Sequence, residues 1–187
     1  NTDNHWTIEA AYLAYAAWQH MRSADSTALE HFSPECVSRT FYGTLYSKAP
    51  AFGIRPDKLY IPAKLPKAKV RINAEESDAI YDMGKLDTKD KYGVYFGGNF
   101  AQIEILMDQT SNDKNKTNKK LLIIKDSFAN SIVPFLMPEY SEIIMLDLRY
   151  FNESISELMK KYQPDETLVL YEISNFAQDM NFFKILK

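Results

Sequence analysis

The chain has 187 residues, of which 45% are hydrophobic and 13% aromatic, enough for one sizeable core, so we predict a single domain over residues 1–187. Its formal net charge of −3 argues against nucleic acid as a partner, because phosphate recognition leaves a basic footprint. The one cysteine, Cys36, excludes an internal disulfide, so packing must hold the fold.

Nothing in the chain is apolar for long enough to predict a membrane-spanning helix. The longest strongly apolar run covers residues 121–124, whereas a spanning helix needs about 20. There is no signal peptide, and the first residues read as the middle of a structured segment. We therefore expect the chain to be truncated at its N-terminus, with any targeting sequence upstream of residue 1.

The first element is an aromatic helix over residues 8–22, because apolar side chains recur there at helical spacing and Thr7 is suited to cap it. Between residues 41 and 73 the pattern changes to short β-prone stretches separated by prolines, which predicts a small excursion of strands and loops. Within it, residues 58–61 and 69–72 are the expected strands.

The middle of the chain is less regular. Residues 93–99 read as a strand ending in a turn, and residues 102–106 alternate like a second strand. Residues 110–120 are almost wholly polar, which predicts an exposed loop.

The last third predicts a series of strands and helices in alternation, β-α-β-α-β. Such a series favours parallel strands with helices covering both faces, a three-layer α/β fold with a mainly parallel sheet. Pro134 requires its helix either to begin just before it or to bend. The expected strands are residues 121–124, 143–146 and 167–171, and the expected helices are residues 129–136 and 154–162.

Ser127 follows the first of these strands and opens a helical stretch, so its hydroxyl should lie at the carboxyl edge of the sheet. Ligand sites of α/β folds lie at that edge, where amides and the helix dipole can stabilise an oxyanion. Taken alone, a serine after a strand is more often simply a helix cap.

Asp3 and His5 are two residues apart, so in an extended segment they project to the same side. The carboxylate can then receive the imidazole proton and fix its tautomer; the alternative is a pair on a solvated edge. His20 and His31 have no evident partner, and no cluster of residues has the spacing of a metal site. We expect no cofactor.

Five segments together resemble the DHHW proteins and the related alginate O-acetyltransferases of the SGNH hydrolase superfamily, in which an Asp-x-His-Trp motif supplies acid and base. The likeness runs from the first residue to about residue 176. The segments are Thr2-Asp3-Asn4-His5-Trp6-Thr7, Phe41-Tyr42-Gly43-Thr44-Leu45-Tyr46-Ser47-Lys48-Ala49, Phe96-Gly97-Gly98-Asn99, Lys125-Asp126-Ser127-Phe128-Ala129-Asn130 and Ile144-Met145-Leu146-Asp147-Leu148-Arg149-Tyr150.

The resemblance implies an SGNH-like fold with a catalytic triad of Ser127 as nucleophile, His5 as general base and Asp3 as the residue that orients it. The chain order of this triad fits a circularly permuted topology. Asn4 stands where the name-giving motif has another histidine, which indicates that this side chain is not needed for the chemistry.

The resemblance also implies an oxyanion hole built from the serine amide, a glycine amide and an asparagine. Asn175 follows the last core strand, while Asn99 follows Gly98 in a segment that equally reads as a tight turn. Arg149 and Trp6 are candidates for substrate binding, although Arg149 also fits an ion pair with the neighbouring Asp147.

Two functions follow. The first is O-acetyl transfer or deacetylation of a cell-surface polysaccharide or sugar ester through an acetyl-serine intermediate, which makes the chain an SGNH-type O-acetyltransferase or acetyl esterase. The resemblance implies a bacterial protein of the cell envelope, outside the cytoplasm, whose acetyl donor is a membrane-bound partner. The second is a non-catalytic carbohydrate-binding or assembly module with the same fold.

Overall fold

The structure is a computed structural model that describes residues 2–22, 32–77, 79–108 and 118–186. Its helices and strands are α1 (Ile8–Arg22), β1 (Pro34–Phe41), α2 (Thr44–Lys48), β2 (Asp57–Pro62), β3 (Ala68–Ile72), β4 (Glu75–Ser77), the 3-10 helices η2 (Met83–Asp87) and η3 (Lys91–Val94), β5 (Gln102–Met107), β6 (Lys120–Lys125), η4 (Ser127–Ser131), α3 (Val133–Leu136), η5 (Met137–Glu139), β7 (Glu142–Leu146), α4 (Ile155–Tyr162), β8 (Glu166–Leu170), α5 (Ile173–Gln178) and η6 (Met180–Leu186).

The backbone groups into two compact units, each assembled from separate stretches of chain. Unit 1 consists of Asn1–Leu65, Tyr81–Gly98 and Asn130–Phe135, and unit 2 consists of Pro66–Ile80, Asn99–Ala129 and Leu136–Lys187. The chain therefore passes from unit 2 into unit 1 within η4, after Ala129. The single domain predicted over residues 1–187 stays a prediction.

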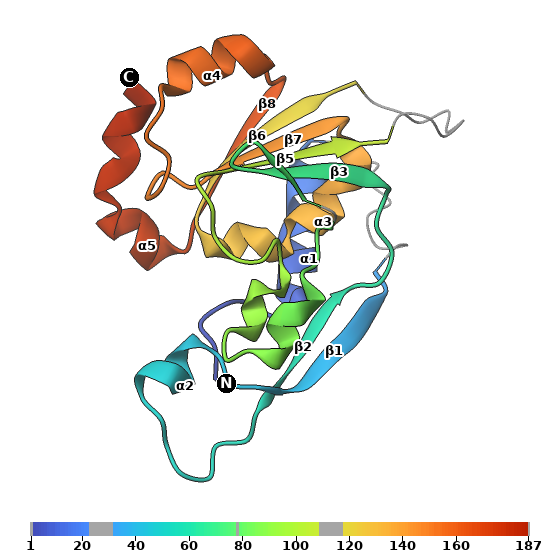
Figure 1. Cartoon of the computed structure of the whole chain (residues 1–187), viewed down its shortest axis with the longest axis vertical. Coiled ribbons are helices and arrows are strands. Elements are labelled where there is room, and N and C mark those ends of the chain that lie inside the picture. The colour runs from blue at the N-terminus through green and yellow to red at the C-terminus, as the bar shows by residue number, and fades with distance from the viewer. Residues whose placement is uncertain (1, 23–31, 78, 109–117, 187) are drawn as a thin grey trace. The chain divides into compact units, whose positions relative to one another are not determined.

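Unit 2 contains a six-stranded sheet in the order β4-β3-β5-β7-β6-β8 (Figure 1). β6 pairs in parallel with both β7 and β8, as the alternating pattern predicts. The other three pairings are antiparallel, so the expectation of a mainly parallel sheet is wrong and the fold is α/β with a mixed sheet. One reason is a two-residue hairpin turn between β3 and β4 at Asn73 and Ala74, both with positive φ, which joins neighbouring strands in opposite directions.

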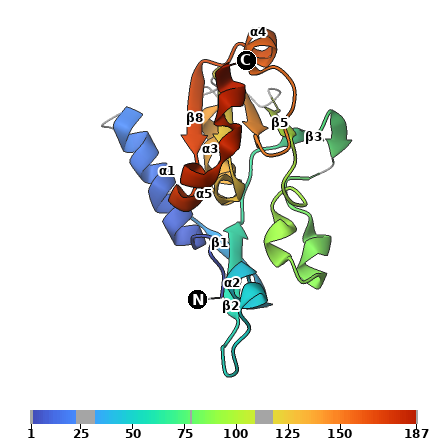
Figure 2. The same cartoon turned by 90° about the vertical axis from the view of Figure 1, so that its left-hand side faces the viewer.

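The centre of this sheet is covered on both faces. Leu121 and Leu122 are consecutive residues of β6, so they point to opposite faces of the sheet, and both are buried, as expected of a strand with no solvent-facing side. On one face α4 packs against β6 and β7, and Phe182 and Ile185 of η6 join it; Figures 1 and 2 show α4 and the C-terminal helices beside the β8 end of the sheet. The buried residues on this face are Leu122, Ile124, Ile144, Leu146, Leu148, Phe151, Ile155, Leu158 and Tyr162.

Unit 1 contains α1, the antiparallel pair β1 and β2, and the 3-10 helices η2 and η3. Thr7 caps α1 as predicted, because its hydroxyl oxygen accepts from the Ala10 amide at 3.3 Å. The aromatic stripe of α1 belongs to the core, because Tyr12 is 5% exposed, stacks on Phe32 and meets Phe135 edge to face.

Two expected elements differ from the structure. The strand expected at residues 93–99 is wrong, because η3 occupies its start and Phe96, Gly97 and Gly98 have φ values of 60°, 81° and 137°, which no strand allows. The helix expected at residues 129–136 is divided into η4 and α3, with Pro134 in the first turn of α3. The polar loop expected at residues 110–120 lies mostly outside the described residues.

No helix in the described part of the chain is long and apolar enough to cross a membrane.

Candidate active site

Ser127 opens η4 two residues after β6 ends, at the carboxyl edge of the parallel strands. The intervening Asp126 is 1% exposed and holds the turn. One carboxylate oxygen accepts from the Phe128 amide at 2.9 Å, and the other accepts from the Glu172 amide at 3.0 Å and from Asn175 Nδ2 at 2.7 Å. The buried Asp126 carboxylate thus links the backbone that carries Ser127 with the segment that follows β8.

Lys125, the last residue of β6, has a fully buried side chain. Its Nζ donates to Asn99 Oδ1 at 3.2 Å and lies 4.0 Å from Asp147 Oδ2. Burial lowers the pKa of Lys125 to about 8, although the charge of Asp147 opposes this change. Because the amine engages the oxygen of the Asn99 side chain, the Nδ2 donor of Asn99 faces away from Lys125.

The three candidates for the oxyanion hole have different surroundings. The Asn175 side chain donates to Asp126, whereas the Asn99 side chain is oriented by Lys125. The N–H of Gly98 donates to the carbonyl of Tyr95 at 3.2 Å, and its φ of 137° supports the tight-turn interpretation. Their part in catalysis stays a prediction.

Arg149 forms the ion pair that its spacing from Asp147 allows. Nε donates to Asp147 Oδ1 at 2.8 Å and a terminal nitrogen donates to Oδ2 at 2.6 Å, and Asp147 is fully buried. This two-point hydrogen bond raises the pKa of Arg149 above its usual value. Arg149 also lines a pocket in unit 2, so its candidacy for substrate binding stays open.

Asp3 and His5 of unit 1 are in contact. His5 Nδ1 lies 2.8 Å from Asp3 Oδ2, and the two side chains are 9% and 8% exposed, respectively. Asp3 Oδ1 accepts from the Thr44 amide at 2.8 Å. Burial would raise the pKa of Asp3, but the hydrogen bonds from His5 and Thr44 outweigh it and lower the pKa. An ionised Asp3 assigns the proton to Nδ1 and makes Nε2 the basic nitrogen of His5.

Backbone contacts explain why this segment holds the pair. Thr2 donates to Asp57 Oδ2 from its amide at 2.6 Å and from its hydroxyl at 2.7 Å, and its carbonyl accepts from the Tyr46 amide at 2.9 Å. A Cβ at Gly43 would lie 2.2 Å from Asp3 Cβ. The carboxylate can therefore reach the Thr44 amide only because residue 43 has no side chain. The sequence shows both Gly43 and Thr44 inside one of the resembling segments, yet gives no sign of their role.

Tyr92 supports the other side of the imidazole. Its ring stacks on His5 with a centroid distance of 3.7 Å and an interplanar angle of 8°. The hydroxyl of Tyr92 and the indole N–H of Trp6 both donate to Ser131 Oγ, at 3.3 and 2.8 Å. Trp6, a candidate for substrate binding, thus has a hydrogen-bond partner in unit 1. The sequence gives no sign that Trp6 contacts Ser131, or that His5 contacts Tyr92.

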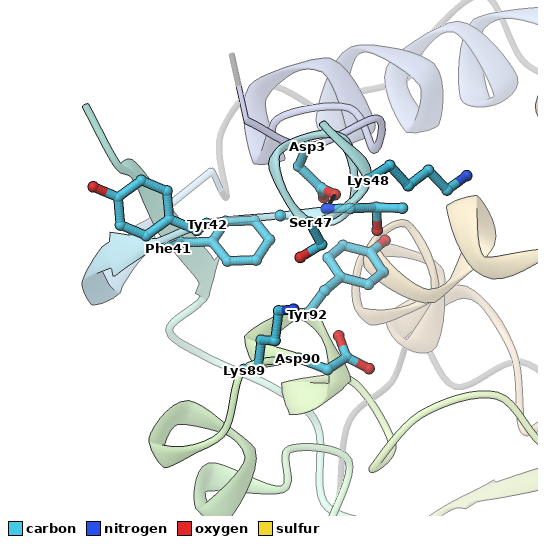
Figure 3. A pocket seen from close by; sticks show the side chains of 10 residues that line it. Asp3, Phe41, Tyr42, Ser47, Lys48, Lys89, Asp90 and Tyr92 are labelled. Carbon is cyan, nitrogen blue, oxygen red and sulfur yellow. Dashed lines mark hydrogen bonds between the residues drawn. The ribbon is translucent and has the colours of Figure 1, made fainter. Parts of the chain in front are cut away.

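A pocket of about 390 Å³ lies on the Asp3 side of the pair. Figure 3 shows the Ser47 hydroxyl and the Tyr92 ring turned towards its interior, with Phe41 opposite. A ligand here would touch the groups that position His5 rather than its Nε2. The lining residues are Asp3, Phe41, Tyr42, Gly43, Thr44, Ser47, Lys48, Lys89, Asp90 and Tyr92.

The structure therefore brings together Asp3 and His5 in unit 1, and Lys125, Asp126 and Asn175 around the Ser127 turn in unit 2. The triad as a whole stays a prediction. Over the described ranges there is no group of three or more His, Cys, Asp or Glu side chains that could hold a metal ion. His20 is exposed, and His31 lies outside those ranges.

Comparison with known proteins places the sequence in a family. The profile of the DHHW protein family matches residues 1–146, which is most of the chain. The chain belongs to the DHHW protein family. A search of curated proteins found no match.

Solved structures agree with this assignment at the level of the fold. A DHHW family protein from Eubacterium siraeum is 26% identical and covers 99% of this chain, with a TM-score of 0.77. Bacillus cereus PatB1 with a sulfonyl adduct is 23% identical over 97% of this chain, with a TM-score of 0.71, and a second PatB1 structure is 21% identical over 96%, with a TM-score of 0.72. This chain spans only 62% or 63% of those proteins.

Proposed function

We propose that this chain performs serine-dependent acyl-ester chemistry, with Ser127 as nucleophile, His5 as general base and Asp3 as the residue that orients His5. The observation that carries the proposal is the hydrogen bond between His5 Nδ1 and Asp3 Oδ2 at 2.8 Å. A second bond, from the Thr44 amide, fixes Asp3. An imidazole held in this way has the tautomer that a serine nucleophile requires of its base.

The position of Ser127 supports the same proposal. It follows a buried parallel strand and begins a short helix, the place where α/β folds build ligand sites. We further propose that the fold is of the SGNH type, with the permuted order Asp, His, Ser. One of the similar structures carries a sulfonyl adduct, and such an adduct forms when a nucleophile displaces a leaving group from sulfur, which suggests a probe for Ser127.

The proposed reaction has two halves. His5 Nε2 takes the proton of the Ser127 hydroxyl while Oγ attacks the carbonyl carbon of an acetyl ester, and the carbonyl oxygen becomes an oxyanion stabilised by N–H donors. When the oxyanion collapses, the ester C–O bond breaks and the leaving oxygen takes the proton from His5. The acetyl group is then on Ser127. An acceptor hydroxyl repeats these steps in reverse.

The acceptor decides the name of the activity. A sugar hydroxyl makes the protein an O-acetyltransferase of the kind found among the alginate O-acetyltransferases, and water makes it an acetyl esterase. We propose cell-surface polysaccharide as the substrate and a location outside the cytoplasm, with a membrane-bound partner as the acetyl donor. These proposals rest on the family resemblance.

Hydrolysis of 4-nitrophenyl acetate by the wild-type chain and by Ser127→Ala tests the proposal, together with intact-mass measurement after exposure to phenylmethylsulfonyl fluoride. We expect the wild type to gain one sulfonyl group on Ser127 and the variant to gain none. We also expect ester turnover to fall by several orders of magnitude, as for other triad serines.

Ser156→Ala is the matched control, because Ser156 is an exposed residue of α4 in the same unit and its loss should leave the labelling of Ser127 intact. Equal hydrolysis by wild type and Ser127→Ala, with no adduct on folded protein, would contradict the catalytic proposal. The non-catalytic carbohydrate-binding module would then be the better hypothesis.

A further inference from the structure

The loop between α2 and β2 in unit 1 exposes large apolar side chains. Residues 47–55 are all exposed, and Figures 1 and 2 both show this loop leading away from α2 and β2. Phe52 is fully exposed, Ile54 is 42% exposed, and Leu45 of the adjoining α2 is 49% exposed. One exposed apolar residue is ordinary on a protein surface, but several in one short segment, including a whole phenyl ring, indicate an interaction site.

The sequence of the loop restrains its shape. Pro50 and Pro56 fix the backbone φ on either side of the tip, and Gly53, with a φ of 81°, lets the chain turn directly after Phe52. The Tyr42 hydroxyl donates to the carbonyl of residue 54 at 3.4 Å. A loop restrained in this way loses less conformational entropy on binding than a flexible one.

The charged side chains within this segment are all basic. Residues 42–56 contain Lys48 and Arg55 and no acidic residue, and both basic side chains are exposed. The next carboxylate along the chain, Asp57, accepts hydrogen bonds from the amide and the hydroxyl of Thr2. Because the whole chain has a net charge of −3, the loop is a local excess of positive charge on an acidic protein.

An apolar tip flanked by basic side chains matches the surface of an anionic lipid bilayer. Apolar side chains enter the boundary between headgroups and acyl chains there, while ammonium and guanidinium groups lie level with the lipid phosphates. A protein partner fits less well, because a stable protein interface takes about 20–30 residues a side, more than this loop exposes. Positive charge alone would suit any polyanion, so it is the apolar tip that selects lipid.

We propose that the loop over residues 49–55 docks on the surface of a bilayer that contains anionic lipid, with Phe52 and Ile54 inserted and Arg55 against the lipid phosphates. This docking does not depend on the proposed function. If that function holds, docking also brings the acid–base pair close to a membrane-bound acetyl donor, because α2, which leads into the loop, begins at Thr44, and the Thr44 amide holds Asp3.

Docking is tested by sedimentation of the full chain with vesicles of phosphatidylcholine, alone or mixed with an equal amount of phosphatidylglycerol. We expect binding to the mixed vesicles, weaker binding to the neutral ones, and a loss of binding as the salt concentration rises. If the chain does not sediment with the mixed vesicles at millimolar lipid and low salt, the proposal is wrong and a protein partner becomes the better hypothesis for this loop.

Phe52→Ser measures the contribution of the tip. We expect its partition coefficient on the mixed vesicles to fall about tenfold or more, the effect of withdrawing one phenyl ring from an apolar environment, with no change in melting temperature because the ring is exposed. Leu13→Ser is the control, since Leu13 is 64% exposed on α1 of the same unit. Equal binding by Phe52→Ser and the wild type would overturn the proposal.

Arg55→Gln measures the contribution of charge. Its partition coefficient should fall about fivefold on the mixed vesicles, the effect of one basic residue near an anionic bilayer, and should not change on the neutral ones. An equal fall on both kinds of vesicle would contradict a contact with anionic lipid.

Phe52→Trp tests insertion directly. The new indole should be quenched by brominated acyl chains in the mixed vesicles, as judged by the difference in emission from the wild type, and the absence of quenching in the bound state would show that the tip stays outside the bilayer and overturn the proposal. Vesicle binding without any ester turnover by the wild type would uphold docking and reject the proposed chemistry, and turnover without vesicle binding would do the reverse.

Discussion

The two units support their candidate catalytic side chains in different ways. In unit 1, Asp3 and His5 lie in an irregular segment before α1, where the hydrogen bond from the Thr44 amide positions Asp3 and the stack on Tyr92 positions His5. In unit 2, Ser127 follows a strand that is hydrogen-bonded on both sides and buried on both faces. A side chain held by few polar contacts should be sensitive to single substitutions, whereas a strand end with many apolar neighbours should tolerate them.

Asp3→Asn should have the largest effect, because it alters the contact on which His5 depends. We expect kcat for ester hydrolysis to fall by about 10⁴-fold, since an amide no longer favours the tautomer with its proton on Nδ1. Steady-state kinetics and thermal melting of the variant measure the effect. Asp90→Asn, on the same pocket, is the control, and an unchanged rate for Asp3→Asn would remove Asp3 from the mechanism.

Asp3→Asn also has a pH signature. The pKa of Asp3 in the folded chain is below its usual value of 3.8, so its ionised form contributes stability above that pH, and the contribution is lost as the pH falls through the folded pKa. The wild type should therefore lose more stability than Asp3→Asn on acidification below pH 3.8.

Asn99→Ala and Asn175→Ala test which asparagine of unit 2 is the oxyanion donor and which one stabilises the fold. Lys125 turns the donor of Asn99 away from itself, while the donor of Asn175 engages Asp126. We expect Asn99→Ala to lower kcat by about 10²- to 10³-fold, the effect of losing an oxyanion donor. Asn175→Ala should instead lower the free energy of unfolding by about 1.5–3 kcal/mol, through its bond to a carboxylate. Kinetics and urea denaturation of both variants measure these effects. If Asn175 is the oxyanion donor, Asn175→Ala will instead show the loss in kcat and Asn99→Ala will not.

Lys125→Met tests whether the buried amine makes the stability of the chain depend on pH, which is a smaller effect than those above. The pKa of Lys125 in the folded chain, about 8, is below its usual value of 10.5, so the unfolded chain binds more protons between these pH values and the stability of the wild type should rise with pH across them. At 1.36 kcal/mol per pKa unit the rise is roughly 3 kcal/mol. Denaturation at several pH values should show this slope in the wild type and not in Lys125→Met; parallel curves would mean that the amine is not buried as described.

Much of the strand arrangement around Ser127 could be predicted from the sequence. The continuous apolar runs of β6 and β7 identify strands that are covered on both faces, as parallel strands usually are. The run of β8 also predicts its strand, although its residues alternate between half-buried and exposed. The antiparallel half was missed because the turn at Asn73 and Ala74 lacks the glycine that signals such hairpins. Gly97 and Gly98 read as the end of a strand, although positive φ begins already at Phe96.

The candidate site was predictable only where its contacts are local. Asp3 and His5 are two residues apart, and Arg149 and Asp147 are too, so spacing alone indicated both pairs. The Thr44 amide is 41 residues from Asp3, and the ring of Tyr92 is further still from His5. No periodicity links such positions, because they meet only through tertiary packing.

The absence of a side chain at Gly43 has a consequence for sequence variation in the family. A Cβ there would overlap Asp3, so the two positions should not mutate independently. In a relative that keeps the Asp-x-His-Trp motif, an alanine or larger residue at this position would indicate either a displaced carboxylate or a lost reaction. Position 43 can therefore help to sort active from inactive members of the family before any of them is purified.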